Sequence, residues 1–152
     1  LLIDADMRRG RIAKYLGVQH DLGLSDLLSG KATLEETMFH IDFENLTFIS
    51  SGAVPHNPAE LLGSDKMKAL LNEARTKFDF VLIDSPPIIS VTDSGIIGAQ
   101  AEGVLMIVQA SRTQRGIVER ATELLEQAHA KVIGHVLTNI EYHLPEYIYR
   151  YL

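Results

Sequence analysis

The chain has 152 residues, of which 46% are hydrophobic and 22% are charged, and its formal net charge is −6. This length fits one domain, and this composition is that of a folded globular protein. The negative charge argues against a dedicated nucleic-acid-binding protein. The sequence has no cysteine, which excludes disulfides and thiolate metal sites but leaves the cellular compartment open.

The first predicted element is a strand within residues 1–9, L-L-I-D-A-D-M-R-R. A short apolar run of this kind suits a parallel strand that is buried on both faces, and Asp4 and Asp6 stand at its end. Arginines come next, at Arg8, Arg9 and Arg11. They form either a solvated basic turn or a contact to phosphate or to a partner protein.

Two short helices are predicted to follow this strand. The first covers residues 12–16, and Gly17 is well placed to end it. The second lies within residues 23–30, where Ser25 is the expected N-cap because a hydroxyl oxygen can accept a backbone N–H bond.

A third helix and a strand complete the first third of the chain. Thr33 and Glu36 have the T-x-x-E spacing of a capping box, which predicts a helix over residues 33–39. The apolar run at residues 46–50 predicts a strand.

Residues 51–62, S-G-A-V-P-H-N-P-A-E-L-L, predict a constrained loop that turns into a helix. Asn57 as N-cap and Pro58 at the first helical position explain this turn locally. A longer helix is expected to begin after Ser64 and to run to residue 77. Its buried stripe is predicted to consist of Met67, Leu70, Leu71 and Ala74.

A second aspartate-ended strand is predicted within F-D-F-V-L-I-D-S-P-P, at residues 78–83 and followed by Asp84. The Pro-Pro pair prevents a helix from starting at once, so residues 88–90 are expected to be extended. Thr92 or Asp93 then caps the next helix.

The last predicted elements alternate in type. They are a strand at residues 103–109, a helix at residues 113–130 and a strand at residues 131–139. Strands that alternate with helices predict right-handed βαβ units, and therefore an α/β fold with a mostly parallel sheet flanked by helices. Asn139, at the end of the last strand, suits a turn.

The two aspartate-ended strands together indicate a site. One such strand is common, because an aspartate at a strand end often only caps the next helix. Ligands of open α/β sheets bind outside the carboxyl ends of the strands, and two strands bring Asp4, Asp6 and Asp84 to that edge. The pair therefore predicts a cation site, most simply Mg²⁺ with a phosphate ligand.

These motifs resemble those of a known family. L-L-I-D-A-D-M-R-R resembles the Walker A′ motif, and V-L-I-D-S-P-P the Walker B motif, of the bacterial protein-tyrosine kinases that control capsule and exopolysaccharide synthesis. The P-H-N-P-A-E-L-L stretch is similar to a signature of the same kinases. The family often has proline where Gly10 stands, which predicts a looser turn here.

One part of the family pattern is not found in the sequence. The P-loop motif, G-x-x-x-x-G-K-[ST], does not occur in the 152 residues. The resemblance therefore implies a deviant-Walker P-loop NTPase fold without its P-loop strand and helix, truncated before that motif. Residues 1–139 are expected to be a partial ATPase domain, and residues 1–152 alone are expected to bind ATP weakly or not at all and to fold poorly.

The resemblance also assigns roles to single residues. Asp84 would hold Mg²⁺, Asp4 would order Mg²⁺ or accept the tyrosine proton, and Asp6 would support the same site. Arg8 and Asn139 would contact the ATP cofactor.

The last segment, residues 140–152, is rich in tyrosine. Four of the five tyrosines of the chain lie there, at Tyr142, Tyr147, Tyr149 and Tyr151. The resemblance implies that they are autophosphorylation sites, modified in trans by a neighbouring subunit of a homo-oligomeric ring. The alternative is that the alternating tyrosines pack on the core as one face of a strand.

The family further implies a cytoplasmic protein at the inner face of the plasma membrane. Its partner would be a membrane polysaccharide copolymerase or an activator segment, and not a nucleic acid. Two alternatives stay open: a Min/Par-type positioning ATPase, which shares both Walker-type strands, and a non-catalytic regulatory partner domain of the copolymerase.

Overall fold

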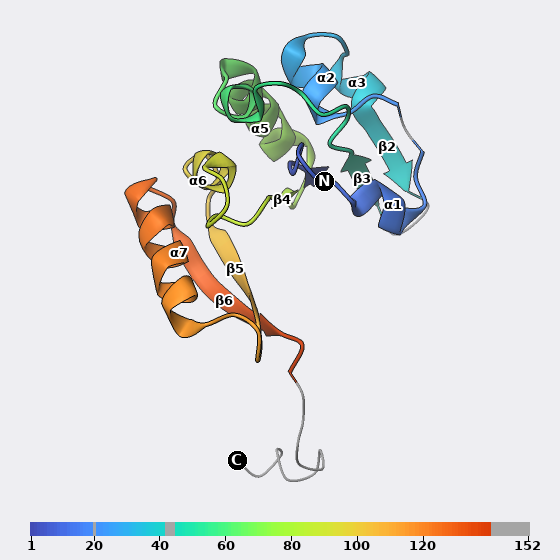
Figure 1. Cartoon of the computed structure of the whole chain (residues 1–152). Helices are drawn as coiled ribbons and strands as arrows, with labels where there is room; N and C mark the ends of the chain where they lie inside the picture. Colours follow the sequence, from blue (N-terminus) through green and yellow to red (C-terminus); the bar gives the residue numbers. More distant parts are fainter. Residues whose placement is uncertain (20, 42–44, 141–152) are drawn as a thin grey trace.

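Two separate sheets carry the strands of this protein (Figure 1). The structure, a computed structural model, describes residues 1–19, 21–41 and 45–140. The four-stranded sheet has the order β2 (Met38–Ile41), β3 (Leu46–Ile49), β1 (Leu2–Asp4), β4 (Leu82–Asp84). The two-stranded sheet pairs β5 (Val104–Gln109) with β6 (Val132–Thr138).

The strand directions confirm the predicted α/β class with a mostly parallel sheet. β1 runs parallel to both β3 and β4, and β5 runs parallel to β6. Only β2 is antiparallel to its neighbour, β3, among the pairs that the structure describes. The strands of the described residues form two sheets, because no strand among them joins β4 to β5.

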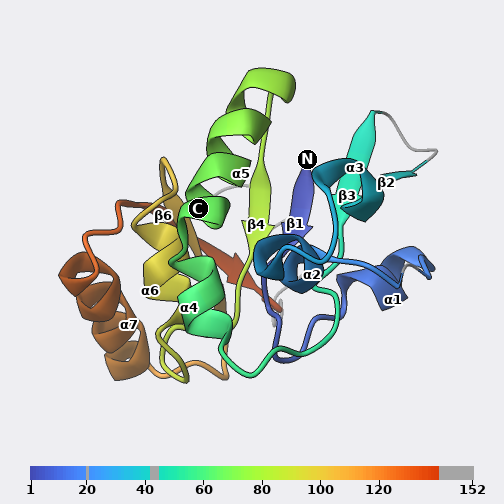
Figure 2. The same ribbon diagram turned by 90° about the horizontal axis from the view of Figure 1, so that it is seen from above.

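Helices connect these strands and cover them (Figure 2). α4 contacts both α2 and α6, so these three lie in a row, and α5 lies alongside β4. The helices are α1 (Ile12–Leu16), α2 (Leu24–Ser29), α3 (Leu34–Thr37), α4 (Pro58–Leu62), α5 (Asp65–Lys77), α6 (Asp93–Gly98) and α7 (Arg115–Gln127).

Several helix ends form as their local sequence predicts. Gly17 ends α1 in the left-handed conformation, with φ 67°. The Thr33 hydroxyl accepts the N–H of Glu36, and the Glu36 carboxylate accepts the N–H of Thr33. Ser64 accepts the N–H of Met67 and so caps α5.

The described residues form two apolar clusters, one for each sheet. The predicted stripe of α5 is buried and packs with Ile3 of β1 and Ile49 of β3. The second cluster is smaller and lies between β5 and α7, where Met106, Ala121 and Leu125 are buried. Burying one large aliphatic side chain contributes about 1.5–3 kcal/mol, so the larger cluster contributes most to the stability of the fold.

Two predictions near the N-terminal helices are wrong. The helix expected over residues 33–39 ends at Thr37, because residues 38–41 pair with β3 instead. Ser25 is not the N-cap of α2; Gly23 is, and its N–H donates to the Asp26 carboxylate. The chain enters α2 while still hydrogen-bonded to the end of β3, through Leu24 N–H to the Ser50 carbonyl, and this contact decides where the helix begins.

The later elements are shorter than predicted. β4 covers three residues rather than 78–83, because its pairing with β1 begins at Leu82. Residues 88–90 form a turn rather than an extended segment, closed by the Ser90 N–H and the Pro87 carbonyl. α7 and β6 each begin and end within the ranges expected for them.

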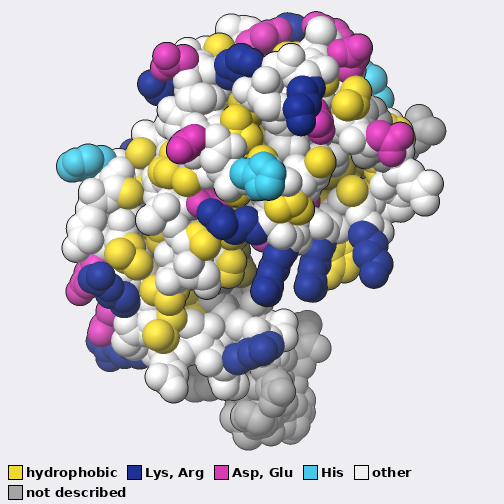
Figure 3. Space-filling view, turned by 45° about the horizontal axis from the view of Figure 1, so that its top comes forward, with side chains coloured by type: hydrophobic (Ala, Val, Ile, Leu, Met, Phe, Trp, Pro, Cys, Tyr) yellow, Lys and Arg dark blue, Asp and Glu magenta, His cyan; other side chains and the backbone are white. Residues whose placement is uncertain are grey.

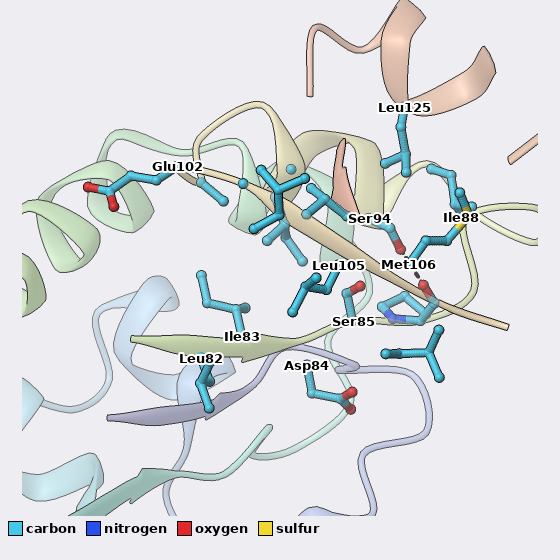
Figure 4. Close-up of a pocket in the computed structure, with 18 of the residues that line it drawn as sticks. Leu82, Ile83, Asp84, Ser85, Ile88, Ser94, Glu102, Leu105, Met106 and Leu125 are labelled. Atoms are coloured by element: carbon cyan, nitrogen blue, oxygen red, sulfur yellow. Dashed lines mark hydrogen bonds between the residues drawn. The ribbon is translucent and has the colours of Figure 1, made fainter. Parts of the chain in front are cut away.

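The apolar side chains of β4 and β5 are not buried on both faces as predicted. Leu82 is 62% exposed, Leu105 is 55% exposed and Ile107 is 62% exposed. These side chains line a cavity of about 1000 Å³ that lies between the two sheets, and Ile83 and Leu105 contribute to opposite walls of it (Figure 4). In the described part of the chain, no strand covers the outer edge of β4 or the facing edge of β5.

Candidate functional site

The site begins with two aspartates at the ends of neighbouring parallel strands. Asp4 is the last residue of β1, Asp84 is the last residue of β4, and the register pairs them directly. The Ala5 N–H donates to the Asp84 carbonyl over 2.9 Å, which continues the pairing one step further. Adjacent strands lie about 4.8 Å apart, so the two carboxylates meet at one edge of the sheet, as the sequence predicts.

Asp4 is buried and held by the backbone. It is 1% exposed, and its two carboxylate oxygens accept the N–H groups of Asp6 and Ile12, each over 3.2 Å. The pKa of Asp4 is raised, first because burial disfavours the charged form and further because Asp84 and Asp6 carry like charges. The two backbone hydrogen bonds act in the opposite direction.

Asp84 is more exposed to solvent than Asp4, and its pKa is shifted in the same direction. Its pKa is also raised, first by the partial withdrawal of its carboxyl group from water and then by the negative charge of Asp6. Two nearby carboxylates whose ionised forms are both disfavoured make an arrangement that a bound cation would stabilise.

Asp6 serves the local backbone. Its Oδ1 atom accepts the N–H groups of Arg8 and Arg9, over 3.1 and 3.0 Å, and so closes the turn that follows β1. Within residues 1–19, 21–41 and 45–140, no group of three or more His, Asp or Glu side chains is arranged to hold a metal ion. Mg²⁺ usually keeps several waters and takes one or two carboxylates with substrate phosphates, so a site for it does not require three carboxylates.

The turn at Gly10 is tight, not loose as the comparison with proline predicted. A Cβ atom at Gly10 would overlap the Ser51 hydroxyl and would lie 2.9 Å from Asp4 Oδ2. Glycine is therefore needed because the backbone passes directly against the buried Asp4 carboxylate.

Arg8 reaches across the site to a residue that was expected only as a helix cap. Its Nε donates to Asp93 Oδ2 over 2.8 Å and its Nη2 donates to Asp93 Oδ1 over 3.1 Å. These bonds use two of the five N–H donors of the guanidinium. The only sequence signal for Asp93 was its place in V-T-D-S, shortly after the second aspartate-ended strand.

Asn139 and the tail tyrosines complete the set of predicted site residues. Asn139 follows β6, is exposed and has a positive φ of 53°, which suits a turn-forming asparagine. The tail tyrosines, Tyr142, Tyr147, Tyr149 and Tyr151, lie outside the described residues. Arg9 and Arg11 are exposed, and Lys and Arg side chains gather along one edge of the molecular surface (Figure 3).

The fold is the α/β fold of the deviant-Walker P-loop NTPases. The cell division ATPase MinD of Pyrococcus furiosus shares this fold, with a TM-score of 0.72 and 25% identity over 96% of this chain and 63% of that chain. The kinase domain of VpsO is more similar, with a TM-score of 0.86 and 30% identity over 92% of this chain and 70% of that chain. The tyrosine-protein kinase Ptk of Acinetobacter johnsonii is 44% identical over 142 residues, which are 93% of this chain and 19% of that protein.

The chain therefore belongs to the family of bacterial tyrosine kinases. It matches no established protein-family model. It spans about a fifth of the length of curated relatives such as Ptk and the putative tyrosine-protein kinases EpsB of Ralstonia. None of the described helices is both long enough and apolar enough to cross a bilayer.

Proposed function

We propose that this chain supplies the Mg²⁺-binding and acceptor side of an ATP-dependent protein-tyrosine kinase site. The observation that carries the proposal is the register that sets Asp4 beside Asp84 at the carboxyl edge of the sheet. The tyrosine-kinase names of the relatives support the reaction type. The complete protein would be an autokinase that regulates capsular and exopolysaccharide biosynthesis and export.

Phosphoryl transfer from ATP to tyrosine requires little covalent participation by the protein. In the transfer, a bond forms between the tyrosine oxygen and the γ-phosphorus while the bond from that phosphorus to the bridging oxygen of ATP breaks, and the protein contributes positioning and charge neutralisation. Bound Mg²⁺ would neutralise phosphate charge. Asp84, the more open carboxylate, would hold the cation, with Asp6 supporting the charge of the site. Asp4 would order the cation or take the tyrosine proton, and its raised pKa favours holding a proton.

The phosphate cradle is proposed to come from a strand and helix that pack between β4 and β5. Three features support this position: the facing strand edges, the cavity of about 1000 Å³ and the exposed apolar side chains that line it. A strand in this position would join the two sheets, cover Leu82 and Leu105, and itself be buried on both faces. Arg8, through its further N–H donors, and Asn139 stay proposed contacts of ATP.

The acceptors are proposed to be the tyrosines of residues 140–152 of a neighbouring subunit. Subunits would assemble as a ring at the inner face of the plasma membrane, beside a polysaccharide copolymerase or an activator segment. Phosphorylation adds about 1.5–2 negative charges per tyrosine, and the resulting repulsion would favour opening of the ring.

The test uses the complete protein with labelled ATP and an anti-phosphotyrosine readout. Replacing Asp84→Asn or Asp4→Asn is expected to lower the rate of autophosphorylation by roughly 100-fold or more. Asp65→Asn is the control, because that side chain is 97% exposed on α5, where it pairs with its neighbour Lys68. Phosphotyrosine that forms equally in both aspartate variants would refute the proposed site. A wild-type protein that forms none would instead favour the non-catalytic regulatory domain.

A further inference from the structure

An ion pair between an exposed arginine and a buried aspartate joins the two loops that leave the site. Arg8 belongs to the turn after β1. Asp93 is the first residue of α6, the helix that follows the loop after β4. The pair is bidentate, with N–O distances of 2.8 and 3.1 Å, and connects residues that are 85 positions apart.

The two partners of the pair differ in exposure, and the buried aspartate requires a cation beside it. Asp93 is 0% exposed, whereas the Arg8 side chain is 42% exposed. A buried carboxylate without a positively charged partner is strongly disfavoured, so the Arg8 guanidinium is held against the Asp93 carboxylate. The planar fork of arginine matches both carboxylate oxygens, which the single ammonium of lysine does not.

The pair acts on the site through a short series of hydrogen bonds. The Arg8 N–H is bonded to Asp6 Oδ1, and the Asp6 N–H is bonded to Asp4 Oδ1. On the other loop, the Ser94 hydroxyl donates to the Pro86 carbonyl and so fixes the segment that directly follows Asp84. The loop after β1 and the loop after β4 are thereby fastened to each other.

We propose that Arg8 and Asp93 are positioning residues that hold Asp4 and Asp84 at the spacing a divalent cation requires. This inference rests on the proposed function, because it concerns the same cation site. Neither residue would coordinate the cation; their effect passes through Asp6 and through the segment after Asp84. Outer-shell residues of this kind commonly change metal affinity by about 10–100-fold when they are replaced.

The experiment compares Arg8→Lys, Arg8→Gln, Asp93→Asn and the double variant Arg8→Gln/Asp93→Asn in the complete protein. Two quantities are measured: the affinity for Mn²⁺, by electron paramagnetic resonance, and the Mg²⁺ concentration that gives half-maximal kinase rate. Arg8→Gln and Asp93→Asn are expected to weaken Mn²⁺ binding by roughly 10-fold or more, and the double variant by no more than the worse single variant. Arg115→Gln is the matched control, since Arg115 makes an exposed ion pair with Glu119 on α7.

The outcomes separate the positioning role from a purely structural one. Arg8→Lys keeps the charge that the buried Asp93 needs, so it tests the role even where Arg8→Gln or Asp93→Asn fails to fold. A folded Arg8→Lys with wild-type Mn²⁺ affinity and wild-type Mg²⁺ dependence would overturn the proposal, as would additive losses in the double variant. A wild-type protein without kinase activity would refute the proposed function alone, because Mn²⁺ binding still reports on the positioning.

Discussion

Replacing Gly10 by alanine should disturb the site by crowding it. The added Cβ would lie 2.7 Å from the Ser51 Cβ and 2.9 Å from Asp4 Oδ2, both closer than such atoms normally approach. Asp4 cannot move aside freely, because two backbone N–H groups hold its carboxylate. Overpacking of this kind costs about 1–3 kcal/mol. For a chain of this length each kcal/mol lowers the melting temperature by about 2–4 °C, so a fall of roughly 2–12 °C is expected.

The assay is thermal unfolding followed by circular dichroism, with the kinase rate of the complete protein as a second readout. Gly116→Ala is the matched control, because no other group lies within 4 Å of a Cβ there and the position is helical. Alanine should leave that variant unchanged or stabilise it by about 0.5–1 kcal/mol. A Gly10→Ala protein that melts with the wild type and keeps its activity would refute the close approach of Gly10 to Asp4.

Three further outcomes follow from the structure. Asp84→Asn should raise the melting temperature at pH 7, because folding raises the pKa of the Asp84 carboxyl and the ionised carboxylate therefore destabilises the folded state. The stability that the protonated carboxyl gives is complete below its ordinary pKa and is lost as the pH rises through the folded pKa, so the two proteins should melt alike near pH 3. Equal melting temperatures at pH 7 would contradict this prediction. Leu125→Ala should cost about 2–5 kcal/mol in urea unfolding and Ile117→Ala, at 43% exposure, far less; equal losses would argue against the second apolar cluster. Calorimetry of the 152-residue chain should detect weak ATP binding or none. Tight Mg-ATP binding would refute the proposal that a further strand and helix between β4 and β5 supply the phosphate cradle.

Features that depend on neighbouring residues could be predicted well. The end of α1 follows from a glycine, and the starts of α3 and α5 follow from a hydroxyl that can accept an N–H bond a few residues away. The buried stripe of α5 follows from the helical period. Such signals lie within one or two turns of chain, so no tertiary information is needed to read them.

Features that depend on distant partners were missed. The hairpin of β2 with β3 replaced the end of a predicted helix, because strand pairing along residues 38–41 outweighed a capping box that begins at Thr33. The start of α2 was displaced by hydrogen bonds to the end of β3. The exposure of the apolar side chains on β4 and β5 does not follow from their composition, since apolar composition indicates that a strand can be buried and not whether a neighbour is present to bury it.

The sequence by itself determined which carboxylates end the strands, the α/β class and the family resemblance, because these are properties of short runs of residues. Tertiary structure alone decided that Asp4 and Asp84 share one register, that Gly10 passes against Asp4 and that Arg8 is bound by Asp93. The first and the last of these contacts join segments far apart in the chain, and the second depends on the turn that brings Gly10 back against the end of β1. Their geometry depends on how the sheet and helices pack together, and no local pattern records it.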